Sequence, residues 1–133
     1  MANNKVNSNQ AKDKKIDLLY MSPSEVTAKD IAVLLQNENG LTIELWEAMN
    51  VLELVLPNQN SIDFEPLEVS FKDPSDASFV KNRNIITIFA VNLCEEDLTI
   101  ATACFEKIVD KFSGFLCADS EDFNPVYVGS SKK

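Results

Sequence analysis

The stretch Glu96–Phe123, EDLTIATACFEKIVDKFSGFLCADSEDF, contains the longest helical pattern of the chain. Its apolar residues recur at helical spacing, which predicts one buried stripe. That stripe consists of Ala101, Cys104, Phe105, Ile108 and Phe112. Gly114 is expected to end the helix, and a short apolar strand at 115–117 then leads into an acidic cluster at 119–122. Because this helix has the largest apolar face, we expect the remaining elements to pack around it.

Apolar runs and alternating patterns elsewhere predict further strands. These strands lie at 16–21, 41–46, 51–56, 62–65 and 85–91, with an edge strand at 125–128. A first helix is expected to begin after Thr27, which with Asp30 has the spacing of a capping box, and to end at Gly40. Segment 66–83 has no clear period and is expected to contain at most a short helical turn near 77–81.

The predicted order of elements is β-α-β-β-β-β-α-β. Two helices would cover one face of a mostly antiparallel sheet, which is an α+β two-layer sandwich, and a ferredoxin-like variant is its nearest common form. The length of 133 residues suits one domain. We place that domain at 16–128, with a disordered basic tail at 1–15 and a second disordered tail at 129–133.

The charge of the chain is strongly negative and unevenly distributed. The net charge is −9; residues 1–15 contribute +3 and the last two lysines +2, so residues 16–131 carry −14. Between Lys29 and Lys72 there is no basic residue. Such a surface repels phosphate groups, which argues against nucleic acid and anionic membranes as partners. A basic protein would be attracted instead, while acidity that serves only solubility is the competing explanation.

No catalytic motif is apparent in the sequence. The chain has no histidine, the commonest general base and metal ligand. Cys94, Cys104 and Cys117 form no Cys-x-x-Cys pair and indicate a reducing, cytoplasmic compartment. Cys94 lies just before a helix, but its acidic neighbours disfavour a reactive thiolate. No signal peptide or membrane-spanning run is expected. We therefore expect no catalytic residues, no cofactor and no metal.

Two acidic surfaces are the candidate sites for a protein partner. The first is the outer face of the predicted 41–65 meander, where carboxylates surround an aromatic side chain as in an interface hot spot. It consists of Glu44, Trp46, Glu53, Asp63 and Glu65. The second consists of Asp119, Glu121 and Asp122. These three carboxylates supply too few ligands for calcium or magnesium, so a partner contact or a solvated loop is favoured over a metal.

The ending Gly114-Phe115-Leu116-Cys117-Ala118-Asp119-Ser120-Glu121-Asp122-Phe123 resembles the endings of immunity proteins from bacterial contact-dependent and polymorphic toxin systems. Those proteins are small cytoplasmic domains that bind and block a partner toxin, often a basic nuclease. The resemblance implies a non-enzymatic protein that neutralises a basic toxin by direct binding, and it assigns no individual binding residue.

Two other functions stay open. One is a dimeric regulatory or chaperone-like module that binds a protein segment, although a monomer is favoured over a dimer. The other is an enzyme that uses carboxylates alone, for example Glu53 with Asp63 or Glu65.

Overall fold

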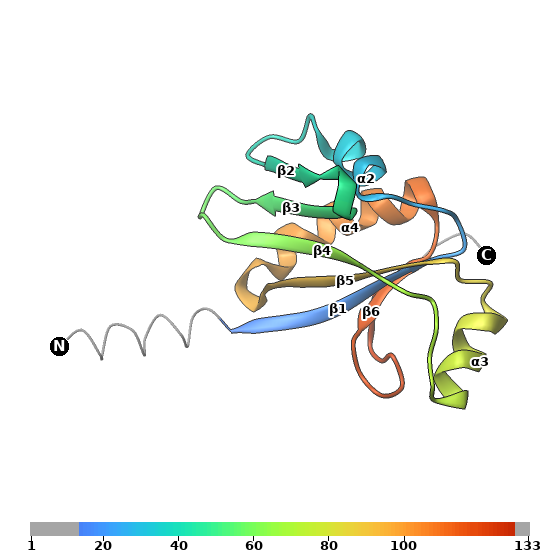
Figure 1. Ribbon diagram of the computed structural model, residues 1–133. Coiled ribbons are helices and arrows are strands. Elements are labelled where there is room, and N and C mark those ends of the chain that lie inside the picture. The colour runs from blue at the N-terminus through green and yellow to red at the C-terminus, as the bar shows by residue number, and fades with distance from the viewer. Residues whose placement is uncertain (1–13, 130–133) are drawn as a thin grey trace.

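A single antiparallel sheet forms the centre of the protein. The computed structural model describes residues 14–129, so most of both predicted tails, 1–13 and 130–133, lies outside the described residues. Seven strands of this part pair in the order β2-β3-β4-β5-β1-β6-β7. Figure 1 shows this order from β2 at the top of the view to β6. They are β1 (Lys15–Ser22), β2 (Thr42–Trp46), β3 (Val51–Val55), β4 (Ser61–Leu67), β5 (Thr87–Cys94), β6 (Phe115–Ala118) and β7 (Val126–Gly129). The predicted tails reached Lys15 at one end and Gly129 at the other, but Lys15 belongs to β1 and Gly129 belongs to β7.

Three helices accompany the sheet in the described residues. They are α2 (Ala28–Leu35), α3 (Pro74–Asn82) and α4 (Leu98–Phe112), with short 3-10 turns η1 (Glu47–Met49) and η2 (Glu95–Asp97). The α+β class and the antiparallel sheet are confirmed. The ferredoxin-like order with two helices is not confirmed, because α3 is a third helix in the segment expected to be irregular.

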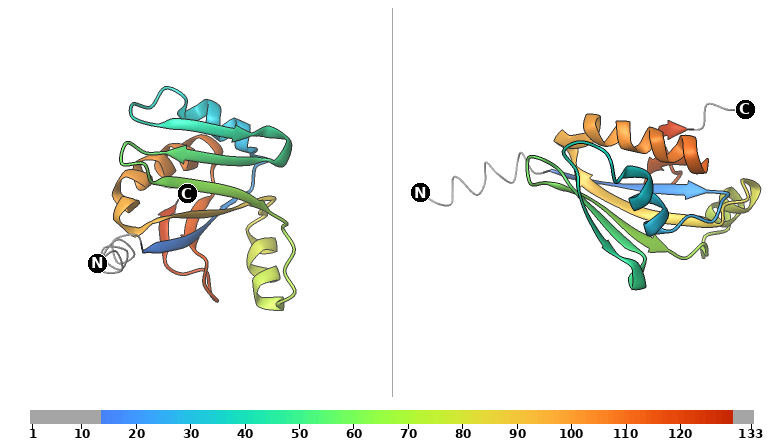
Figure 2. Two further views of the ribbon diagram at one scale, coloured as in Figure 1. Left: turned by 60° about the vertical axis from the view of Figure 1, so that its left-hand side comes forward. Right: turned by 90° about the horizontal axis from the view of Figure 1, so that it is seen from above.

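Helices α2 and α4 belong to the main core on one face of the sheet, and α4 runs along the strands (Figure 2). Helix α2 begins with the predicted capping box: the Asp30 backbone N–H donates to the Thr27 hydroxyl at 3.1 Å, and the Thr27 N–H donates to the Asp30 carboxylate at 3.0 Å. The helix already ends at Leu35, so Gly40 lies in the following loop rather than at the helix end. In α4 the predicted stripe is buried except for Phe112, which is half-buried.

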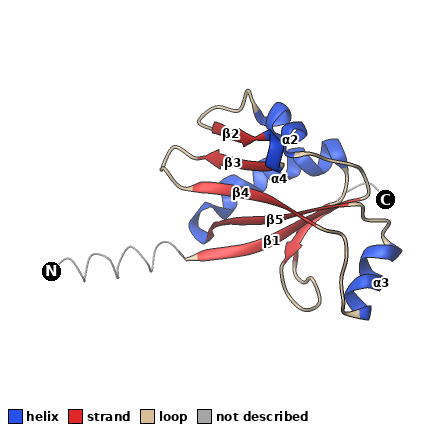
Figure 3. Ribbon diagram, viewed as in Figure 1, coloured by secondary structure: helices blue, strands red, loops and turns tan. Residues whose placement is uncertain are grey.

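Helix α3 covers one corner of the opposite face, apart from the other helices (Figure 3). Asp73 caps its first turn by accepting hydrogen bonds from the N–H groups of Ser75 and Asp76. Its Phe79 ring lies 4.6 Å from that of Phe123 and 6.0 Å from that of Phe115, centroid to centroid. These rings pack over the apolar sheet residues of that corner, which are Leu19, Met21, Ile88 and Cys117. Among the described residues no helix lies on the rest of this face, and we call that part of the sheet the open face.

Candidate functional site

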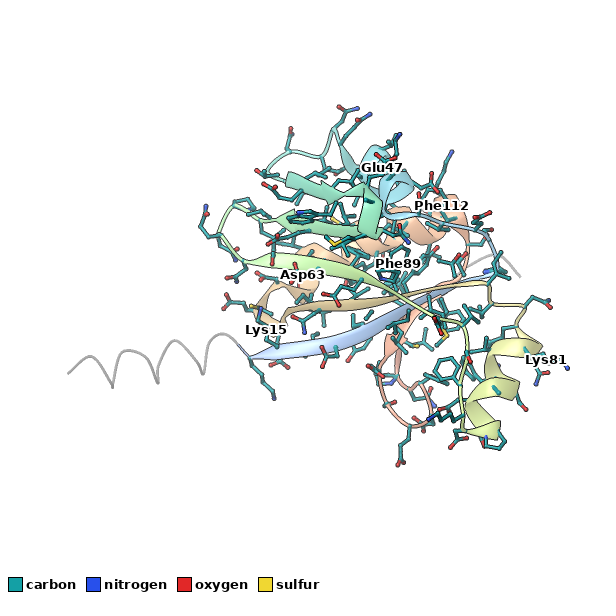
Figure 4. The ribbon with its side chains drawn as sticks, viewed as in Figure 1. Lys15, Glu47, Asp63, Lys81, Phe89 and Phe112 are labelled. Atoms are coloured by element: carbon teal, nitrogen blue, oxygen red, sulfur yellow. The ribbon has the colours of Figure 1, made fainter. Side chains whose placement is uncertain are left out.

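An acidic row crosses the open face at right angles to the strands. We define the row as Glu44 on β2, Glu53 on β3, Asp63 on β4, Asn92 on β5, Asp17 on β1 and Asp119 just beyond β6. The strand register places each of the first four directly opposite the next. Since neighbouring strands are about 4.8 Å apart, the six positions extend over about 24 Å. Figure 4 shows Asp63 near the middle of the sheet.

Asp119 joins this row rather than the loop that follows it. Its backbone N–H donates to the carbonyl oxygen of Asp17 at 3.1 Å, which continues the β1–β6 pairing one residue past Ala118. Burial raises the pKa of the Cys117 thiol to about 12, and the negative charge of Asp119 contributes to this shift. Cys117 packs on the α3 side of the sheet, so Asp119 lies near that side as well.

The carboxylates of the row are not neutralised within the described residues. The Asn92 amide donates to Asp17 Oδ1 at 2.6 Å, and the Ser61 hydroxyl donates to Asp63 Oδ1 at 2.9 Å. Glu44 and Glu53 form no hydrogen bond or ion pair with any side chain between residues 14 and 129. Like charges directly opposite each other destabilise a sheet by roughly 0.2–1 kcal/mol per pair. We therefore expect the two opposite carboxylate pairs, Glu44 with Glu53 and Glu53 with Asp63, to reduce the stability of the fold.

Trp46 and Glu65 lie in the neighbouring row of the same face. Trp46 is opposite Val51, and Glu65 is opposite Ala90. Trp46 is 41% exposed. Helix α3, with Lys81, lies at another corner of the molecule from Glu47, the residue that follows Trp46 (Figure 4). All five residues predicted on the outer face of the meander thus share the open face.

Glu121 and Asp122 occupy a different place. They line a hollow of about 920 Å³ between the β6–β7 loop and α3, together with Asp73, Asp76 and Phe123. Partial burial raises the pKa of the Asp76 carboxyl, and the charges of Asp73 and Glu121 raise it further. Hydrogen bonds from Asn124 lower the pKa of Asp122. One of them is donated by the Asn124 backbone N–H to Asp122 Oδ1 at 3.2 Å, within the β6–β7 loop. The cluster predicted as Asp119, Glu121 and Asp122 is therefore divided between two surfaces.

Metal sites, reactive cysteines and membrane-spanning helices are the other features to consider in the described part of the chain. Among residues 14–129 no group of three or more His, Cys, Asp or Glu side chains is arranged to hold a metal ion. Cys94 is buried at the end of β5. Burial raises the pKa of the Cys104 thiol, as it does for Cys117, and so disfavours a nucleophilic thiolate at both. None of the described helices combines the length and apolarity needed to cross a membrane.

Sequence reasoning missed Asp17 and Asn92 as members of the surface. Both are polar residues within otherwise apolar runs, Ile16–Met21 and Ile88–Cys94, and that interruption was the available signal. Their place in the row depends on β5 pairing with β4 and β1 pairing with β5, which local patterns do not specify.

No family model matches the chain, and neither a curated protein nor a solved structure matches it. Function is therefore argued from the geometry of the open face.

Proposed function

We propose that the protein is a binding protein of the immunity type, which holds a basic toxin domain against the acidic row. The observation that carries the proposal is that Glu44, Glu53 and Asp63 lie directly opposite one another without a neutralising side chain in the described residues. A sheet face shaped only by stability and solubility would intersperse both signs of charge. Departures from such local rules tend to occur at functional sites.

The row fits a partner that itself binds phosphate groups. A nuclease needs lysine and arginine side chains for the nucleic-acid backbone. Five carboxylates spread over about 24 Å offer those side chains an alternative anionic ligand. Trp46 at the border of the row adds a large, partly exposed aromatic surface of the kind found in interface hot spots. Complementary charge would mainly accelerate association.

Capture of the partner from the native cell with matched bait proteins tests the proposal. The baits are the parent protein, Glu53→Lys, and Glu106→Lys, which changes the charge equally on an exposed position of α4. We expect the parent and Glu106→Lys to recover the same basic protein, with recovery lost as salt rises, and Glu53→Lys to recover little of it. The captured protein is then purified and its toxicity and association rate are measured with each bait.

Equal recovery by Glu53→Lys and Glu106→Lys would refute the acidic row as the docking surface. A captured protein that is not toxic, or whose toxicity the parent does not suppress, would refute the immunity function while leaving the surface intact.

A second function is supported by the opposite edge of the sheet. Strand β7 carries Val126 and Tyr127, which are 52% and 39% exposed. Exposed apolar edge strands favour pairing with another chain. We therefore keep a dimeric regulatory module as the alternative. It predicts a salt-resistant dimer in size-exclusion chromatography with light scattering, and a monomer at all salt concentrations would argue against it.

A further inference from the structure

The backbone of β2 is available for pairing along its outer side. β2 is the first strand of the sheet order, and no described strand pairs with it opposite β3 (Figure 1). In an antiparallel pair, two opposite residues either exchange both backbone hydrogen bonds or exchange none. Consecutive residues of a strand therefore direct their N–H and C=O groups alternately to one side of the strand and to the other. The direction of each backbone group on β2 therefore follows from one known bond in the neighbouring pair.

That bond is the one from the Leu56 N–H to the Asn60 carbonyl, at 2.8 Å. It continues the register in which Leu54 is opposite Ile62, so Leu54 directs its backbone groups towards β4 and Glu53 directs its own towards β2. Glu53 is opposite Glu44, which therefore bonds to β3. The residues on either side of Glu44, namely Ile43 and Leu45, direct their N–H and C=O groups away from the sheet.

The side chains along this edge specify what an added strand would carry. Ile43 and Leu45 point towards the helix-covered core but are only half-buried, because no strand between residues 14 and 129 covers their outer side. Residues opposite them would be apolar. The residue between those two would lie opposite Glu44 on the open face and extend the acidic row by one strand. A basic side chain there would face Glu44 and reach towards Glu53.

We infer that the partner docks through an extended segment of alternating apolar and basic residues, which pairs with β2 as an additional strand. The inference rests on the proposed function and specifies how the partner reaches the acidic row. Main-chain hydrogen bonds to Ile43 and Leu45 would supply affinity, and the alternating side chains would supply selectivity. β7 is the other edge of the described sheet, but it carries no carboxylate and therefore offers no opposite charge to a basic strand.

The probe is a short capped peptide in which lysine alternates with valine, added to the full chain. Its control is the same peptide with every valine amide N-methylated, which keeps the charge and side chains but removes the donors that face β2. We expect the unmodified peptide to bind at low salt and the methylated peptide to bind at least tenfold more weakly, because two backbone hydrogen bonds are lost.

Amide hydrogen exchange followed by NMR locates the contact. In the protein alone, the amides of Ile43 and Leu45 are expected to exchange faster than that of Glu44, which bonds to β3. The unmodified peptide should slow both, and the Tyr127 amide on the opposite edge should not change. Glu44→Lys should weaken peptide binding at least threefold, and Glu106→Lys should leave it unchanged.

Several outcomes would overturn the inference. They are equal binding of the two peptides, no binding of either peptide, and protection of the Ile43 and Leu45 amides in the protein alone. Equal binding would leave the acidic row as a flat docking face, so the proposed function would survive. Failure of the proposed function is detected separately, by partner capture with Glu53→Lys, which does not depend on strand pairing.

Discussion

Replacement of Glu53 by lysine should stabilise the folded protein. Glu53 is the central member of a carboxylate triplet, with Glu44 directly opposite on one side and Asp63 on the other. Glu53→Lys converts two like-charge pairs into two opposite-charge pairs. Glutamate and lysine are both depleted in strands, so intrinsic preference changes little.

The size of the gain follows from Coulomb's law. Two unit charges about 6 Å apart interact by about 0.7 kcal/mol at the dielectric constant of water, and physiological salt reduces this roughly by half. Reversal of one charge changes the sign of both interactions, so at physiological salt the free energy of unfolding should rise by about 1.4 kcal/mol. For a domain of this size, that corresponds to about 5 °C in melting temperature.

Urea denaturation at physiological salt and at about 1 M salt measures this gain. The Debye length is about 3 Å at 1 M, so the gain should largely disappear there. Glu106→Lys on α4 is the control and should change the free energy of unfolding by less than about 0.5 kcal/mol. If Glu53→Lys is no more stable than this control, or if its gain persists at high salt, the row does not carry the repulsion that we derive from its register.

Three further predictions concern the scaffold. Gly114→Ala should lower the free energy of unfolding by at least about 3 kcal/mol, because Gly114 has φ +94° and an added Cβ would collide with the Met21 carbonyl oxygen. Gly40→Ala, at φ +84°, is the control and should lower it by about 1 kcal/mol. Equal losses in denaturation would contradict this. Asp97→Asn should cost about 1–3 kcal/mol in urea, since its buried carboxylate accepts two side-chain amide hydrogen bonds at 2.9 Å, and a neutral result would argue against that role. Burial raises the pKa of Tyr20 to about 12 from an ordinary value near 10, so its neutral form stabilises the fold below about pH 10 and this contribution is lost as pH rises towards 12. The stability advantage of the parent over Tyr20→Phe, about 1 kcal/mol at neutral pH, should therefore shrink across that interval, and a constant difference would refute the assignment.

Local patterns were sufficient wherever a feature depends on residues close in the sequence. Thr27 and Asp30 of the capping box are three positions apart, so their signal is purely local. The shared face of Glu44, Glu53 and Asp63 follows from strand alternation and from two short connections that pair consecutive strands. These parts of the fold and of the surface could be predicted from the sequence.

Features that depend on distant contacts could not be predicted in this way. Helix α3 has a weak apolar pattern, and its Phe79 is held by Phe115 and Phe123, which lie more than 30 residues away. Asp17 and Asp119 enter the acidic row only because β1 is placed between β5 and β6. A sequence pattern identifies the face of a strand, but it does not identify the strand's neighbours when the connections are long.

Stability and binding measured on the same variants separate the proposed function from its competitors. A substitution that damages the fold lowers both quantities together. If the carboxylates served solubility alone, Glu53→Lys would raise stability and leave partner capture unchanged. The docking proposal requires opposite changes, with stability raised and capture lost, because the repulsion among Glu44, Glu53 and Asp63 is what a basic partner relieves. Binding of that partner should accordingly stabilise the parent protein more than it stabilises Glu53→Lys.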